Sequence, residues 1–76
     1  MAKKEITFVV TEDEIDGGFV ASAHWADGNR DIITEGDARD ELIRNVREAI
    51  EASFDPSEQK PEFIHLHFVR DEVIAR

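Results

Sequence analysis

One segment limits the possible folds more than any other, because residues 37–53 are the only stretch with apolar side chains at helical spacing. Asp37 is the predicted N-cap, and Asp40 stands where a capping-box acid is expected. The helix should end near Ser53, because Pro56 disfavours helical geometry for the residue before it. The apolar residues recur every three or four positions, the spacing of one helix face: Leu42, Ile43, Val46, Ala49, Ile50 and Phe54.

Four other segments are rich in β-branched and aromatic residues and alternate in polarity, which predicts strands. They span residues 5–11, 19–25, 30–34 and 63–69. Gly17 and Gly18 predict a hairpin turn between the first two strands, and residues 26–29 (Ala-Asp-Gly-Asn) predict a turn before the third. Gly36 is expected to end the third strand. Residues 70–76 could continue the last strand or reach a neighbouring molecule.

The element order β-β-β-α-β predicts an α+β fold with a four-stranded mixed sheet. A meander of three antiparallel strands, followed by a right-handed helical crossover, places the last strand parallel to the first. The strand order is then 3-2-1-4, with the helix on one face of the sheet. The expected core joins three helix residues to four strand residues: Leu42, Val46 and Ile50 with Phe8, Ala21, Ala23 and Leu66.

A chain of 76 residues has room for one domain, spanning 1–76. Domains this short bury only roughly 60–65% of their unfolded surface, and one helix leaves the second face of the sheet uncovered. We therefore expect a dimer or higher oligomer, formed by packing that face or by pairing the edge of the last strand. The expected self-association or partner surface contains Phe63, His65, His67 and Val69. Trp25 is a further candidate, although packing in the core is its more common role.

The charge balance favours a protein partner over a nucleic acid. Nine basic residues against 18 acidic ones give a net charge of −9, which repels phosphate backbones. We expect no direct nucleic-acid binding, and a basic protein is the better-matched partner. No apolar stretch is long enough for a secretory signal or a membrane span, so a cytoplasmic protein without membrane contact is expected.

The residue types also argue against catalysis and metal binding. The absence of cysteine removes thiolate zinc sites and cysteine nucleophiles. His65 and His67 share a strand face, but a third ligand at His24 would lie two strands away, roughly 9–10 Å. The acidic run of residues 12–16 does not have EF-hand spacing. We predict no catalytic residue, no metal site, no cofactor and no enzyme activity.

Four groups of residues resemble the HicB-like antitoxin family, in particular a short branch with a single domain. They are residues 17–21 (GGFVA), 33–38 (ITEGDA), 41–42 (EL) with 45–49 (NVREA), and 61–73 (PEFIHLHFVRDEV), which follow the family's order. The resemblance implies a partial RNase H-like β-β-β-α-β fold, in agreement with the topology above. It also implies a non-enzymatic antitoxin that binds and neutralises a small, basic, RNA-cleaving HicA-like toxin.

Three observations qualify this resemblance. Many family members carry a C-terminal DNA-binding segment, whereas nothing follows Arg76 here, so we expect no DNA-binding module. Residues 25–30 replace the family's Pro-Gly-Cys-type segment. RNase H-like nucleases place a metal-binding carboxylate inside the first strand, and residues 6–10 contain none, so a nuclease is not expected. The alternative hypothesis is a stand-alone regulatory or ligand-binding domain with no toxin partner.

Overall fold

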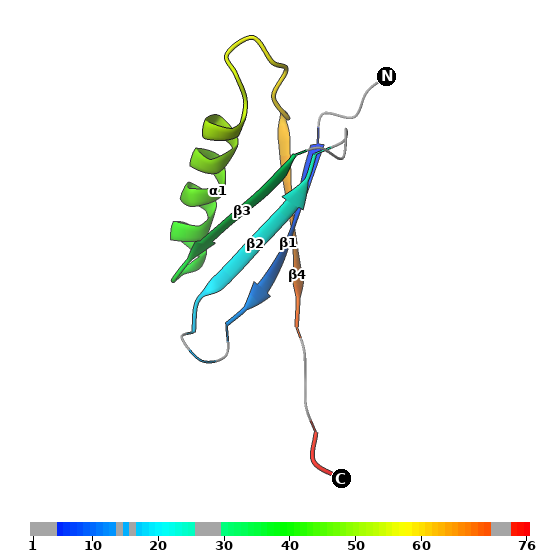
Figure 1. Cartoon of the computed structure of the whole chain (residues 1–76). Helices are drawn as coiled ribbons and strands as arrows, with labels where there is room; N and C mark the ends of the chain where they lie inside the picture. Colours follow the sequence, from blue (N-terminus) through cyan, green and yellow to red (C-terminus); the bar gives the residue numbers. More distant parts are fainter. Residues whose placement is uncertain (1–4, 14, 16, 26–29, 71–73) are drawn as a thin grey trace.

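The computed structural model describes residues 5–13, 15, 17–25, 30–70 and 74–76. Its elements are β1 (Glu5–Glu12), β2 (Phe19–His24), β3 (Asp31–Gly36), α1 (Arg39–Ser53) and β4 (Phe63–Val69). The strands form one sheet in the order β3-β2-β1-β4, in which β4 is parallel to β1 and the other pairs are antiparallel. Figure 1 shows α1 on one face of this sheet, beside β3. The predicted α+β fold and strand order are confirmed.

The predicted element boundaries differ from the observed ones by at most two residues, and the differences have local causes. Gly36 does not interrupt β3, because it pairs with Phe19 of β2 as the last residue of the strand. The predicted N-cap at Asp37 is wrong by one residue, since Ala38 is the N-cap and makes no side-chain capping bond. The Glu41 carboxylate instead accepts a hydrogen bond of 2.6 Å from the backbone N–H of Asp37. The Glu41 side chain therefore fixes the backbone just before the start of α1 through this bond.

The predicted turn at Gly17 and Gly18 is confirmed. Asp13 donates its backbone N–H to the carbonyl of Gly18, and Gly17 donates to the carbonyl of Asp13, both at 2.7 Å. Gly17 has a φ of 77°, which residues with a side chain rarely adopt. The glycine pair thus closes the hairpin between β1 and β2.

A small cluster lies beyond the end of β2. The predicted turn at residues 26–29 is outside the described residues, but Trp25 donates its backbone N–H to the carbonyl of Arg30 at 2.9 Å across it. The Trp25 ring meets Phe54 edge to face at 5.3 Å. The Arg30 guanidinium lies 4.6 Å from the centre of the Phe54 ring and donates to Glu58 at 2.9 Å. Trp25 therefore packs against the core, the more common of its two predicted roles.

The core lies between α1 and the sheet, but the helix is not centred on the sheet. The backbone of α1 lies close to β3 and, less extensively, to β2, whereas no Cα atom of α1 lies within 8 Å of one in β4. Six of the seven predicted core residues are buried, whereas Leu66 is only half-buried at the margin. The buried apolar residues are Ile6, Phe8, Val10, Ala21, Ala23, Ile32, Leu42, Val46, Ile50 and Phe54.

Gly36 allows the close contact between β3 and α1. A Cβ atom at this position would lie 2.6 Å from the backbone nitrogen of Leu42 and 2.7 Å from its Cα. Those distances are far below van der Waals contact, so only glycine fits without a shift of the backbone. Among the described residues, no helix is long and apolar enough to cross a membrane.

Candidate functional site at the fourth strand

β4 forms one edge of the sheet, and within the described part of the chain β1 is the strand that it pairs with. Its register with β1 defines which way each side chain points. Ile64, Leu66 and Phe68 pair with the buried residues of β1 and therefore face the helix side; we call them the helix-side row. The alternate residues Phe63, His65, His67 and Val69 face the opposite side and form the outer row.

Both rows of β4 expose large apolar side chains. Phe63 is 65% exposed, Phe68 46%, and Ile64 and Val69 are each 38% exposed. Apolar residues on both faces are typical of a strand inside a sheet that is covered on both sides. An edge strand, in addition, presents unpaired backbone groups that another chain can bind. β4 thus combines the composition of a central strand with the position of an edge strand.

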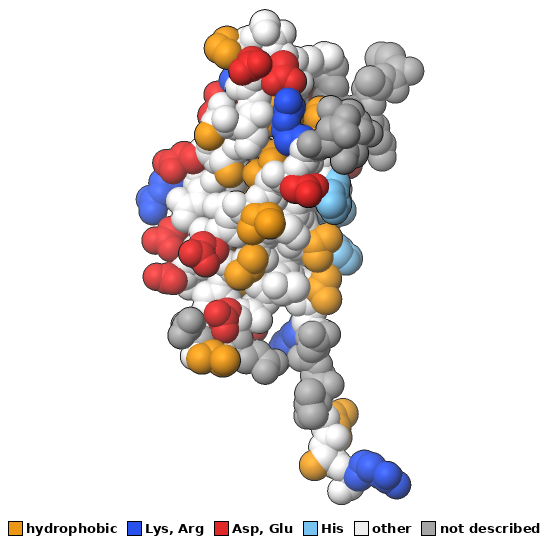
Figure 2. Space-filling model, in the orientation of Figure 1, with side chains coloured by type: hydrophobic (Ala, Val, Ile, Leu, Met, Phe, Trp, Pro, Cys, Tyr) orange, Lys and Arg blue, Asp and Glu red, His pale blue; other side chains and the backbone are white. Residues whose placement is uncertain are grey.

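The structure brings together four of the five predicted interface residues, namely the outer row. The rings of His65 and His67 are 6.3 Å apart. Across the sheet, His67 pairs with Val9, which is 42% exposed and continues the apolar surface onto β1. Figure 2 shows histidine side chains beside hydrophobic ones on one side of the molecule. Trp25 does not belong to this surface, because it packs against Phe54.

A groove of about 370 Å³ lies on the helix side of β4. The helix-side row lines it together with Arg39, Ile43 and Arg47 of α1. The sequence analysis missed this groove because it assumed that α1 would cover the helix-side row. The signal was present in β2, where Ala21 and Ala23 leave room for the helix to approach on that half of the sheet.

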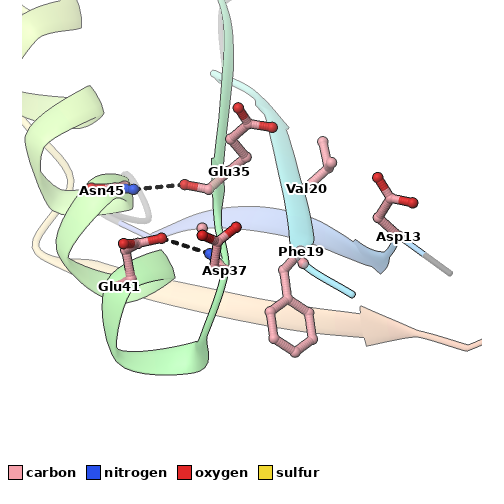
Figure 3. Close-up of a pocket in the computed structure, with 9 residues that line it drawn as sticks. Asp13, Phe19, Val20, Glu35, Asp37, Glu41 and Asn45 are labelled. Atoms are coloured by element: carbon pink, nitrogen blue, oxygen red, sulfur yellow. Dashed lines mark hydrogen bonds between the residues drawn. The ribbon is translucent and has the colours of Figure 1, made fainter. Parts of the chain in front are cut away.

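A second hollow, of about 490 Å³, lies where β3 meets α1 (Figure 3). Asn45 donates its side-chain N–H to the carbonyl of Glu35 at 2.7 Å across one wall. The residues that line the hollow are Asp13, Gly18, Phe19, Val20, Glu35, Gly36, Asp37, Glu41 and Asn45. The lining contains four carboxylates, at Asp13, Glu35, Asp37 and Glu41, and no hydroxyl, thiol or imidazole side chain.

The described residues contain no group of three or more His, Cys, Asp or Glu side chains placed to hold a metal ion. His24 lies on β2 and contacts Asp31 of β3 through its Nδ1 atom. Among the described residues, His65 and His67 therefore have no third side chain of this kind placed with them.

Glu58, which lies in the loop between α1 and β4, has a shifted pKa. The backbone N–H of Asp55 donates to Glu58 at 2.8 Å, and Arg30 donates to its other oxygen at 2.9 Å. The Asp55 bond, followed by the Arg30 bond, lowers the pKa of Glu58 below its ordinary value. This contact joins the loop after α1 to the residue before β3 and is structural.

Comparison with known proteins gives one clear relationship. A curated protein of Thermotoga maritima, described as a UPF0150 protein, is 36% identical over 73 residues. The match covers 96% of this chain and 94% of that protein. No family model and no solved structure matches the chain.

Proposed function

This chain belongs to the UPF0150 family, and we propose that it is a non-enzymatic protein-interaction domain of the HicB antitoxin type. In this role it self-associates through β4 and neutralises a small, basic, RNA-cleaving HicA-like toxin. The observation that carries the proposal is the edge strand β4, which exposes large apolar side chains on both of its faces among the described residues. Exposed apolar surface of this kind marks sites of protein association.

The charge of the chain supports a basic partner. The net charge is −9, and Figure 2 shows acidic side chains along the side of the molecule where α1 lies. Asp40, Glu48 and Glu51 are exposed on that helix. A complementary field accelerates the association of a basic protein and repels RNA from the same surface.

A neutralisation assay tests the toxin-binding part of the proposal. We expect the purified chain, added in equimolar amount, to suppress RNA cleavage by a basic HicA-like toxin. Glu48→Lys combined with Glu51→Lys should slow association roughly tenfold at low salt, and Ser22→Ala on the sheet should have no effect. Unchanged cleavage at a tenfold excess of the chain would contradict the proposal.

A second measurement tests the absence of enzyme activity and the self-association. The purified chain should not cleave RNA in Mg²⁺ or Mn²⁺, and metal-dependent cleavage would contradict a non-enzymatic role. Sedimentation should give a dimer at micromolar concentration. Val69→Asp places a charge in the outer row and should give a monomer, whereas Thr34→Asp on β3 should not. A wild-type monomer at high micromolar concentration would refute self-association.

A further inference from the structure

The sequence of β4 has the same chemical character in both directions. Leu66 is the midpoint of the strand, which runs from Phe63 to Val69. His65 and His67 flank this midpoint, and the next positions outward are apolar on both sides. The matching pairs are His65 with His67, Ile64 with Phe68, Phe63 with Val69, and Glu62 with Arg70, the last of opposite charge.

We propose that a second copy of this chain pairs antiparallel along β4, about a two-fold axis at Leu66, and that His65 and His67 of both copies then bind a divalent transition-metal ion. This rests on the self-association proposed above and specifies its register. Each residue of β4 lies opposite its matching residue in the other copy. The pairing satisfies the free backbone edge of β4 and closes the assembly at two copies.

The flanking charges select this register over its neighbours. With the axis at Leu66, Glu62 of one copy lies opposite Arg70 of the other at both ends of the pair. Moving the axis to His65 would place Glu62 opposite Phe68, and moving it to His67 would place Arg70 opposite Ile64. A charged group opposite an exposed apolar one loses both the ion pair and the apolar contact.

The same register assembles four imidazoles. Within one copy the rings of His65 and His67 are 6.3 Å apart on the outer row. His65 of one copy lies opposite His67 of the other, and opposed residues of antiparallel strands have Cβ atoms roughly 4.5–5.5 Å apart. The neighbours of these histidines on β1 are Thr7 and Val9, which carry no charge. The ring nitrogens of all four can therefore turn toward one point on the axis.

Four imidazole nitrogens in a tetrahedron suit Zn²⁺, and imidazole also binds Ni²⁺ and Cu²⁺. One chain supplies two ligands, and His24 is engaged with Asp31. The second copy supplies the two ligands that a single chain lacks. The metal site thus exists only in the dimer.

Cysteine cross-linking tests the register, because the chain has no cysteine of its own. Phe63→Cys and Val69→Cys should form a disulfide when the two variants are mixed, and neither should cross-link with itself. Ile33→Cys, exposed on the other edge strand, should cross-link with neither. Self-cross-linking of Phe63→Cys, or no cross-linking in any mixture, would overturn the proposed pairing.

Titration calorimetry with Zn²⁺ alone tests the metal site. We expect one ion per two chains and at least a tenfold decrease in the dimer dissociation constant. His65→Gln and His67→Gln should each abolish this binding, whereas His24→Gln should retain it. One ion per chain, no binding at micromolar Zn²⁺, or full binding by His65→Gln would overturn the proposal. Toxin neutralisation is measured separately and without zinc. A negative result in the zinc titration therefore does not contradict the proposed binding of a toxin.

Discussion

At the scale of single residues, Gly36 is the described glycine at which an added methyl group would meet the closest contacts. It is buried, it ends β3, and a Cβ atom there would overlap the backbone of Leu42. Backbone atoms cannot turn aside as the end of a flexible side chain can. The distance between β3 and α1 is therefore determined by this glycine.

We expect Gly36→Ala to lower the free energy of unfolding by about 1–3 kcal/mol, the usual range for overpacking. Ser22→Ala, at an exposed position of β2, is the control and should change it by less than about 0.5 kcal/mol. Urea unfolding followed by Trp25 fluorescence provides the measurement. Equal stability of the two variants would show that α1 can move away from β3 at no cost.

Glu58 gives a pH-dependent prediction at the same scale. Its pKa is lowered in the folded chain by the Asp55 N–H and by Arg30. The ionised carboxylate therefore stabilises the fold above the pKa of the unfolded chain, and this contribution is lost as the pH falls through the lower folded pKa. Glu58→Gln should lower the melting temperature at pH 7, and the difference from wild type should shrink below about pH 4.5. Glu48→Gln, exposed on α1, is the control; a difference that grew on acidification would contradict the assignment.

At the scale of elements, the sequence predicted the strands, the helix and their order, but not the position of the helix over the sheet. Apolar periodicity determines which face of each element is buried. It does not show which of several neighbouring strands a helix contacts. Here the small residues Ala21, Ala23 and Gly36 allow the backbone of α1 to lie close to β2 and β3. The larger side chains of β1 and β4 hold the helix backbone farther from those strands.

Successive side chains of a strand point to opposite faces of the sheet. The sequence alone therefore predicts that the outer row lies together: Phe63, His65, His67 and Val69. The helix-side groove could not be predicted in this way, because its existence depends on where α1 lies. The prediction of Asp37 as the N-cap was wrong because several acidic residues near the start of α1 could each accept a backbone hydrogen bond. Glu41 is the one that does so, from the N–H of Asp37.

The offset of α1 predicts unequal effects of two leucine substitutions. Leu42 is fully buried, so Leu42→Ala should cost about 2–5 kcal/mol of stability. Leu66 is half-buried, so Leu66→Ala should cost about 1 kcal/mol in dilute solution, where the monomer is measured. At high protein concentration the Leu66→Ala deficit should increase, since the wild-type dimer is then populated. Thermal unfolding at two concentrations provides the comparison, and equal deficits for both leucines would contradict the observed packing.

At the scale of the whole molecule, the chain is more extended than a compact domain of its length. Its radius of gyration is 14.0 Å, against about 11 Å expected for 76 residues. Residues 74–76 contribute, since they lie beyond the end of the sheet in Figure 1.

The net charge of −9 leads to a prediction about nucleic acids. We expect no binding to duplex DNA at physiological salt, including the DNA upstream of the chain's own gene, because counterion release requires clustered basic residues. Fluorescence anisotropy with labelled duplexes is a suitable measurement, with a basic DNA-binding protein as positive control. Micromolar binding to the upstream fragment would contradict the expectation.

The hydrogen bond from Asn45 to the carbonyl of Glu35 has a consequence for how large an assembly can grow. Figure 3 shows Asn45 on the side of β3 away from β2, where a further strand would have to add. A sheet with two receptive edges can polymerise into a fibre, whereas one with a single receptive edge stops at a pair. At the edge of β3, the carbonyl of Glu35 is already bonded to Asn45 of α1, so it is not available to a strand of another chain. The bond from the helix to β3 thus opposes growth of the sheet at that edge.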